Sequence, residues 1–531
     1  MLCERWLNMS FLSNNMAVIA VAAVASVLVW VFGGTRGDLL TPIVPWLFVI
    51  MVEVLFFFPQ RHRTESTYEA RERVWRSLKH DPVVWVSLGL LALLSIPFVN
   101  NGLCPFCDYA RIAQGIDPAP PAPFLPFCVS RLSHLNVFWW FLLSLSALVL
   151  VRDGLTRRGK RLVVEMIMWN GAAVAVFGFV QAAMGAQGPF WDTHPGTQWG
   201  ASTFFATFGY PNMAGDYFTT MFVLAAALWR NHIEQVRQEK QRQKAADEEV
   251  FRPRLFWKHH YFLIPAALFF FAALNTLSRA AIILVTTLAV LFFAHTLVCI
   301  LARQRKSKRV VLGVWSLLAF GVIIFFSSVF MPENIKKEVN TLGTIEVLDR
   351  VSGRGQNHEK LALALWRDNK LFGCGGWGYA HLCPTKMTSQ ERRNGQAPGS
   401  ANVHNDCLQF LTEHGLVGFG ALVALVVLLF WPIGRSWKQL VKESRFKKDK
   451  EAPPRPRQIF VLPAPVFFIL LGCLATLIHS LGDCPLRSPA ILLVFFVNLA
   501  ALPGFMPKGG SRPPEAEEEN HHHHHHHHSH H

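Results

Sequence analysis

The stretch that decides the fold reads AAIILVTTLAVLFFAHTLVCIL over residues 280–301, and the basic cluster Arg303-Gln-Arg-Lys-Ser-Lys-Arg309 follows it directly. The block has no Asp, Glu, Lys or Arg. It is long enough to cross a bilayer as a helix, because about 20 apolar residues span the hydrocarbon core. Basic loops stay on the cytoplasmic side of a membrane. The pairing of apolar block and basic loop recurs along the chain and predicts an integral membrane protein.

Counting such blocks predicts an all-α membrane protein with about 12 transmembrane helices. The blocks lie at 11–32, 40–58, 82–100, 134–151, 162–184, 203–229, 261–277, 280–301, 310–330, 415–433, 459–480 and 487–504. Lys and Arg concentrate in the loops that follow even-numbered blocks, so we expect both termini to be cytoplasmic. A large, mainly helical loop between the ninth and tenth helices then faces the opposite side.

Domain organisation follows from this count. We expect transmembrane helices 1–9 in residues 1–330, the catalytic loop in 331–414, helices 10–12 in 415–505, and a cytoplasmic tail with a histidine tag in 506–531. With 51% hydrophobic and 16% charged residues, the 531-residue chain is not an ordinary soluble enzyme, a disulfide scaffold or a disordered chain. The net charge of +16 is explained by topology, so we expect no nucleic-acid partner.

Most of the 10 cysteines fall on the side away from the cytoplasm, where disulfides are permitted. Cys374 with Cys383 is a natural pair, as are two of Cys104, Cys107 and Cys128, although sequence leaves the connectivity open. The Cys104-Pro-Phe-Cys107 spacing resembles that of a redox pair, but no βαβ pattern surrounds it. No second Cys or His pair follows at the spacing of a zinc site.

The large outer loop holds the residues that could carry chemistry. The run from about 356 to 369 has helical spacing, and Arg350 and Arg354 are four residues apart before it. A glycine-rich turn follows at 371–378. The loop closes with a helix that contains His404, breaks at Gly415 and continues into the tenth span. We expect His404 at the membrane surface, and its alternative role is structural.

Two polar breaks at span ends add further candidates. Arg279 opens the eighth span, where a charge usually faces a cavity or a partner. Pro211 interrupts the sixth span beside Asn212 and Asp216, and such a break suggests a lined cavity. The alternative for Asp216 is an interhelical salt bridge, for example to Arg279.

Two arginines and a histidine facing outward at the membrane suit one reaction. Arginine stays charged and binds phosphate oxygens through a planar fork, so it could hold a lipid-linked diphosphate as it departs. A neutral histidine could take the proton of an attacking hydroxyl. The outer loops have no Asp-x-Asp pair to hold a metal, so we expect neither a metal nor a cofactor.

The order of these motifs resembles that of the O-antigen ligase family of membrane glycosyltransferases. The resemblance covers roughly 200–430. It rests on five elements, listed in chain order: Tyr210-Pro211-Asn212, Ser278-Arg279, Ser352-Gly353-Arg354, the Gly373–Gly378 turn, and His404-Asn405-Asp406 with Glu413-His-Gly415. The chain departs from the family pattern where His358 replaces an aromatic residue, in the insertion at 380–401 and in the Cys-Pro-Phe-Cys segment.

The resemblance implies transfer of a glycan from undecaprenyl diphosphate to an acceptor on the periplasmic face of the bacterial inner membrane, without metal and with inversion at the anomeric carbon. It implies that His404 acts as base or orients the acceptor, and that Arg279 and Arg354 clamp the diphosphate. The candidate substrate-binding residues are Arg350, Asn405, Gln409, Asn212 and Asp216. The expected partners are the lipid-linked donor, a lipid A–core acceptor and membrane lipid, with the chain as a monomer.

Other functions remain open at this point. Within the family, a glycan polymerase or a protein O-oligosaccharyltransferase would use the same donor with another acceptor. A transporter or lipid flippase would share the twelve-span layout, but we expect it to carry ionisable residues at mid-membrane and related halves. A non-catalytic scaffold would tolerate replacement of His404 and both arginines.

Overall fold

The computed structural model describes residues 9–62, 64–100, 122, 124–192, 204–245, 260–301, 358–388, 402–446 and 462–506. Within these residues the secondary structure is helical, apart from an isolated bridge between Phe205 and Phe208. The longer helices are α2 (Met9–Trp30), α4 (Val44–Phe57), α5 (Thr67–His80), α6 (Pro82–Ser95), α8 (Arg131–Val149), α9 (Arg157–Ala183), α10 (Pro211–Ala245), α12 (Leu263–Asn275), α13 (Arg279–Leu301), α19 (Asp406–Phe446), α20 (Ala464–His479) and α21 (Pro489–Ala501). Every predicted block coincides with one of them except 310–330, which lies outside the described residues.

The described helices support fewer clear membrane spans than the predicted twelve. Five of them are long and apolar enough to cross a bilayer: α2, α8, α9, α13 and α19. A sixth arises if α5 and α6, which meet at a 65° bend, count as one span, and α4, α12, α20 and α21 are shorter apolar helices. The all-helical, multi-pass character is confirmed, whereas the count of twelve and the sides of the loops remain predictions.

The helices divide into a buried centre and an apolar outer layer. Every residue of α21 is buried, and α10 packs against α20, α12 and α13. In contrast, only 22% of the apolar windows of α13 and α19 is buried, and large apolar side chains such as Trp431 and Ile283 point outward. A helix that is apolar all round yet exposed suits contact with lipid, so this outer layer is consistent with a membrane protein.

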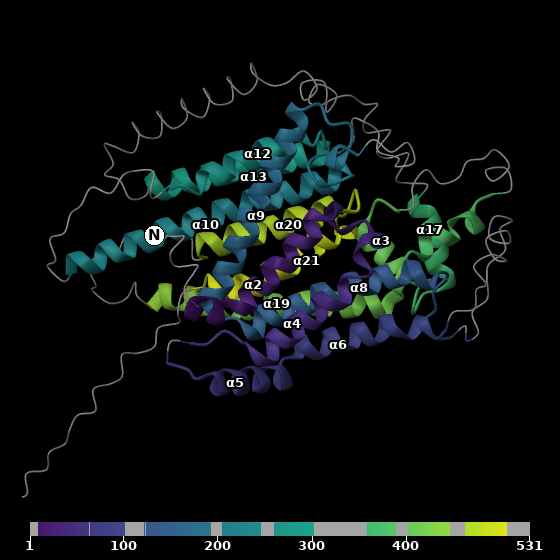
Figure 1. Ribbon diagram of the computed structural model, residues 1–531, viewed down its shortest axis with the longest axis horizontal. Coiled ribbons are helices and arrows are strands. Elements are labelled where there is room, and N and C mark those ends of the chain that lie inside the picture. Colours follow the sequence, from purple (N-terminus) through teal and green to yellow (C-terminus); the bar gives the residue numbers. More distant parts are fainter. Residues whose placement is uncertain are drawn as a thin grey trace, which may run out of the picture.

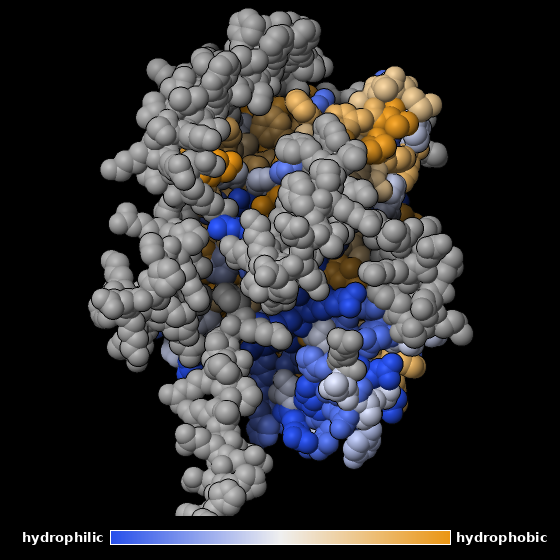
Figure 2. All heavy atoms as spheres, turned by 90° about the vertical axis from the view of Figure 1, so that its left-hand side faces the viewer, coloured by the Kyte–Doolittle hydropathy of each residue, from blue (hydrophilic) through white to orange (hydrophobic). Residues whose placement is uncertain are grey.

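The basic helix α5 and the short helix α17 (Gly378–Leu382) lie toward opposite ends of the bundle (Figure 1). Helix α5 begins with a Ser66–Glu69 capping box and lies at the left-hand end in Figure 1, while α17 lies at the right-hand end. Viewed from the left, hydrophilic side chains gather in the lower part of the molecule, where α5 lies (Figure 2). The glycine-rich turn next to α17 therefore lies toward the end of the bundle opposite the basic helix α5 (Figure 1).

Candidate functional site

His404 lies just before α19, so the prediction that the closing helix contains it is wrong. Its backbone φ is 59°, in the left-handed region, and its side chain is 31% exposed. Two polar side chains hold this turn: Gln409 Oε1 accepts from Val403 N at 3.0 Å, and Asn405 Oδ1 accepts at 3.0 Å from the backbone N–H three residues on. The Asn405 contact is an N-cap, which satisfies a backbone donor of the first turn and competes with continuation of the helix. His404 is thus presented at a capped helix start.

Asp483, in the loop between α20 and α21, is the residue to which His404 binds. Nδ1 of His404 lies 3.2 Å from Asp483 Oδ1, and the backbone N–H of Cys484 donates to the same oxygen at 2.8 Å. Tyr210 donates its hydroxyl to Oδ2 at 3.0 Å, and the Asn212 amide donates to that oxygen too. Asp483 therefore joins the start of α10 to the turn before α19.

The electrostatics of this pair fix the state of the histidine. Burial raises the pKa of Asp483, but the hydrogen bond and the charge of His404 outweigh it, and the pKa of the carboxyl lies below its usual range. An ionised carboxylate can only accept, so Nδ1 of His404 carries the proton. In the neutral imidazole Nε2 is then the nitrogen with a lone pair, which is the arrangement a general base needs.

Sequence reasoning identified Tyr210 and Asn212 as a motif but missed Asp483. A signal was present: Asp483 is the only acidic residue in the short loop 481–486 between the last two apolar blocks. The hydrogen bonds from Tyr210 and Asn212 show why the motif has those residue types, since a phenol and a carboxamide both donate to a carboxylate.

Arg279 begins α13, directly after a sharp break from α12. Leu277 in this break has a φ of 58°. The break packs on Gly215 of α10, where an added Cβ would lie 2.4 Å from the Cβ of Ala281. Close packing at Gly215 places the start of α13 beside the first turn of α10, the turn whose Asn212 reaches Asp483. The other two predicted arginines, Arg350 and Arg354, lie outside the described residues.

Asp216 does not face the candidate site. Its side chain is 1% exposed, its Oδ1 lies 3.1 Å from His479 Nδ1, and its Oδ2 accepts from Thr476 at 2.9 Å. The predicted role in substrate binding is therefore corrected, because the carboxylate is enclosed and ties α10 to α20. The partner in this buried pair is His479.

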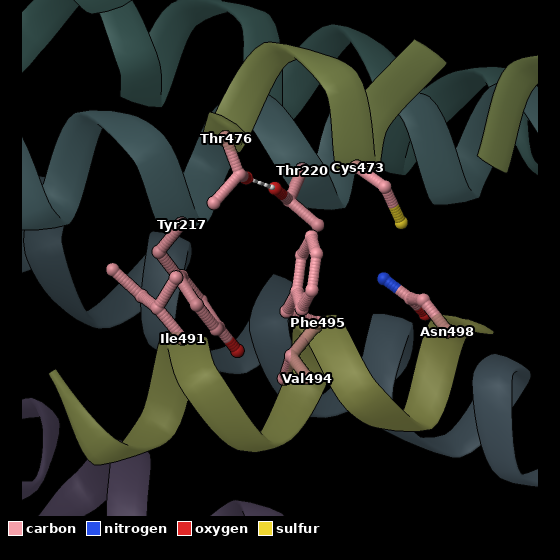
Figure 3. Close-up of a pocket in the computed structure, with 8 residues that line it drawn as sticks. All are labelled: Tyr217, Thr220, Cys473, Thr476, Ile491, Val494, Phe495 and Asn498. Carbon is pink, nitrogen blue, oxygen red and sulfur yellow. Dashed lines mark hydrogen bonds between the residues drawn. The ribbon is translucent and has the colours of Figure 1, made fainter. Parts of the chain in front are cut away.

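A small cavity lies between α10, α20 and α21 beside this pair. Thr476 contacts Thr220 across it at 3.3 Å, and the close-up shows the side chains of the three helices converging (Figure 3). Its lining residues are Tyr217, Thr220, Cys473, Thr476, Ile491, Val494, Phe495 and Asn498. It is too small for a glycan, so it belongs to the packing of the bundle.

Gln409, another predicted substrate-binding residue, is also fully buried. It donates to Glu413 Oε1 at 3.1 Å, and Glu413 in turn accepts from Arg487 at 2.5 Å. The guanidinium of Arg487 lies 5.1 Å from the ring centroid of Trp377. Gln409 therefore acts through the backbone of the His404 turn rather than by touching a substrate.

The glycine-rich turn donates backbone hydrogen bonds at the break in α19. Gly415 has a φ of 64° and a ψ of −170°, and this break frees carbonyl groups of the preceding turn. Cys374 N donates to Thr412 O at 3.1 Å, and Gly375 N donates to Glu413 O at 2.8 Å. A Cβ on Gly373 would lie 2.3 Å from the backbone of Glu413, so the approach requires glycine. The predicted break at Gly415 is confirmed, and these glycines have a packing role.

Comparison with protein families supplies the decisive observation. Residues 264–423 match the model of the O-antigen ligase family. This segment is similar to the O-antigen ligase family. No curated protein sequence matches the chain. The matched segment includes Arg279 and His404, and it confirms the resemblance stated from the motifs.

The hydrogen-bond network of His404 includes residues on both sides of the matched segment. Tyr210 and Asn212 precede residue 264, and Asp483 follows residue 423. The C-terminal helices α20 and α21 therefore contribute to the same site as the matched segment. The described helices make the chain a multi-pass membrane protein, and its central segment is similar to the O-antigen ligase family.

Within the matched segment, His358 and Asn405 form a second polar cluster beside His404. His358 Nδ1 lies 2.7 Å from the Tyr379 hydroxyl, and its ring centroid lies 5.9 Å from that of His404. Burial and then the charge of His404 lower the pKa of His358. Asn405 donates to Glu359 at 3.4 Å. His358, the residue that departs from the family pattern, therefore lies next to His404.

The cysteine prediction is wrong in the part that the structure describes. Cys374 and Cys383 are free thiols, as is Cys128. Cys374 donates to Thr412 O at 3.5 Å and Cys383 to Ala380 O at 3.7 Å, so each thiol has a backbone acceptor instead of a disulfide partner. Burial raises the pKa of Cys383 to about 12, which makes it an unreactive thiol. Cys104 and Cys107 lie outside the described residues.

Proposed function

We propose that this protein is a glycosyltransferase that moves a glycan from undecaprenyl diphosphate to lipid A–core on the periplasmic face of the inner membrane. The observation that carries the proposal is the hydrogen bond between Asp483 and His404. His404 is partly exposed and lies within the segment that matches the O-antigen ligase family. Asp483 and His404 contact each other, so neither side chain is enclosed in an apolar core without a partner. The basic helix α5 lies toward the other end of the bundle (Figure 1).

In this mechanism His404 acts as the base. Its Nε2 accepts the proton of the acceptor hydroxyl while the hydroxyl oxygen attacks C1 of the donor sugar. The Asp483 carboxylate stabilises the imidazolium that forms and holds the ring in the required tautomer. The bond between C1 and the diphosphate oxygen breaks as the new bond forms from the opposite face, so the anomeric configuration is inverted.

Arginine supplies the remaining chemistry by holding the leaving group. Arg279 begins α13 at the mouth formed with α10, and Arg354 is proposed as the second member of the clamp, with Arg350 as a further phosphate contact. A guanidinium held in place neutralises the charge that develops on the diphosphate without a metal ion. A lysine at position 279 lacks the planar fork, so Arg279→Lys should retain only part of the activity and Arg279→Ala less.

Reconstitution with defined acceptors tests the proposal and separates it from its relatives. The purified protein is mixed with undecaprenyl-diphosphate glycan and, in turn, lipid A–core, additional donor glycan or a Ser/Thr peptide. Glycosylated lipid A–core supports the ligase. Longer lipid-linked glycans indicate a polymerase, and a modified peptide indicates a protein oligosaccharyltransferase. Donor that stays unconsumed with every acceptor would contradict all three and favour a transporter.

A further inference from the structure

The His404–Asp483 pair has a third neighbour that the transfer reaction does not use. Cys484 follows Asp483 in the chain, is 1% exposed, and directs its Sγ toward Asp483 Oδ1 at 3.3 Å. Nδ1 of His404 lies 3.2 Å from the same oxygen. The ligand atoms of the three residues all lie within 4.8 Å of one another. An imidazole nitrogen, a carboxylate oxygen and a thiol sulfur therefore converge on one point.

The spacing of these atoms suits a tetrahedral cation. A zinc ion lies about 2.0–2.3 Å from nitrogen, oxygen and sulfur ligands, which sets tetrahedral ligands roughly 3.3–3.8 Å apart. The distances from Asp483 Oδ1 to His404 Nδ1, 3.2 Å, and to Cys484 Sγ, 3.3 Å, are at or just below the lower end of this range, so small side-chain rotations would complete the site. The exposed side of His404 leaves the fourth position to water.

The donor set selects the class of cation. Thiolate and imidazole favour zinc-type borderline-soft ions, whereas Mg²⁺ and Ca²⁺ prefer shells of oxygen. One thiolate and one carboxylate also balance the charge of a divalent ion, which matters because Asp483 and Cys484 are both buried. Binding would release the thiol proton to solvent, since the metal binds the thiolate.

We propose that His404, Asp483 and Cys484 form a binding site for a zinc-type divalent cation, and that the bound cation switches the transferase off. The inhibitory effect rests on the proposed function and follows from the tautomer. A neutral imidazole carries one proton, so when Nδ1 binds the metal that proton moves to Nε2. Nε2 then donates and cannot take the acceptor proton.

Cobalt absorption tests the site without any activity measurement. Co²⁺ gives a near-ultraviolet charge-transfer band only when a thiolate binds it, so nitrogen ligands in the histidine tag do not contribute. We compare the full chain with Cys484→Ser and with the matched control Cys407→Ser, a half-buried cysteine outside the three-residue cluster. Wild type and Cys407→Ser should show the band, Zn²⁺ but not Mg²⁺ should remove it, and Cys484→Ser should lack it.

Two spectral results would overturn the site: no thiolate band in wild type, or an equal band in Cys484→Ser. Inhibition is then measured on each variant relative to its own metal-free rate. Zn²⁺ should inhibit wild type and Cys407→Ser reversibly, with EDTA restoring the rate, and Cys484→Ser should need more than about ten times as much Zn²⁺. Equal sensitivity would refute the inhibitory role. A cobalt band without any transferase activity would instead leave the cation site intact and contradict the proposed function.

Discussion

Replacing Asp483 with asparagine isolates the charge of the carboxylate from its shape. Oδ1 accepts from His404 Nδ1 at 3.2 Å and from Cys484 N at 2.8 Å, so the asparagine oxygen should take that place. The asparagine NH₂ then faces Tyr210 and Asn212, which both donate to Oδ2 in the wild type. The variant keeps an acceptor for His404 but loses the charge that stabilises the imidazolium.

The expected cost follows from the kind of bond that is lost. A hydrogen bond to a charged group contributes about 1.5–3 kcal/mol, against about 0.5–1.5 kcal/mol for a neutral one. The variant loses the charge-assisted bond to His404, and its NH₂ group faces the Tyr210 and Asn212 donors. The two effects together should raise the activation barrier of transfer by about 1.5–3 kcal/mol. At 1.36 kcal/mol per tenfold, kcat should fall by about 10–150-fold. KM for the donor should change little, because Asp483 is proposed to act through His404 and not on the substrate.

Initial rates of transfer in detergent, with thermal unfolding as a check on the fold, measure this effect. Tyr210→Phe is the matched control, because it removes one neutral donor to the same carboxylate and leaves the charge. Its cost in kcat should be smaller than that of Asp483→Asn, because the carboxylate keeps both its charge and its hydrogen bond to His404. A folded Asp483→Asn variant within twofold of the wild-type rate, or one less impaired than Tyr210→Phe, would refute the reasoning.

Three further predictions concern the structure around the site. Gly415→Ala would place a Cβ 2.2 Å from a backbone oxygen at a φ of 64°, so it should cost more than about 2 kcal/mol of stability and lower Tm. Gly420→Ala is the control, because its Cβ would meet nothing within 4 Å and Tm should not fall. Equal Tm values for the two variants would contradict this reasoning. Glu413→Gln removes the buried negative charge that pairs at 2.5 Å with the largely enclosed Arg487, and it should cost about 3–5 kcal/mol in thermal or denaturant unfolding; a loss below about 1 kcal/mol would show that the ion pair is dispensable. Cys383, with a pKa of about 12, should resist iodoacetamide at pH 8 in the folded protein and react after unfolding, as read by mass spectrometry; rapid labelling of the native protein would disprove its burial.

The sequence was sufficient for features that depend on local composition. Apolar blocks predicted the helices because membrane helices satisfy their own backbone groups, and all the blocks within the described residues coincide with helices. The break at Gly415 was likewise predictable, since glycine before a long apolar run favours a backbone that other residues avoid. Span length was less predictable: Pro211 begins α10 instead of kinking a longer helix.

Features that depend on long-range packing were not predictable from one sequence. Asp483 reaches His404 only because α20 ends beside the start of α19, a contact across 79 positions of the chain. Asp216 looked like a lining residue because it is a carboxylate in an apolar block, yet His479 on another helix encloses it. The expected pairing of Cys374 with Cys383 failed for a similar reason, since each thiol found a backbone acceptor nearby.

Donor consumption by His404→Ala tests the central claim most directly. The variant and wild type are incubated with undecaprenyl-diphosphate glycan and lipid A–core in EDTA, with His62→Ala as control because His62 is exposed near the start of α5. We predict that wild type and His62→Ala release undecaprenyl diphosphate and form glycosylated lipid A–core at similar rates. His404→Ala should be at least about 100-fold slower while folding normally. A folded His404→Ala variant that transfers glycan at the wild-type rate would contradict the claim that this histidine is the base.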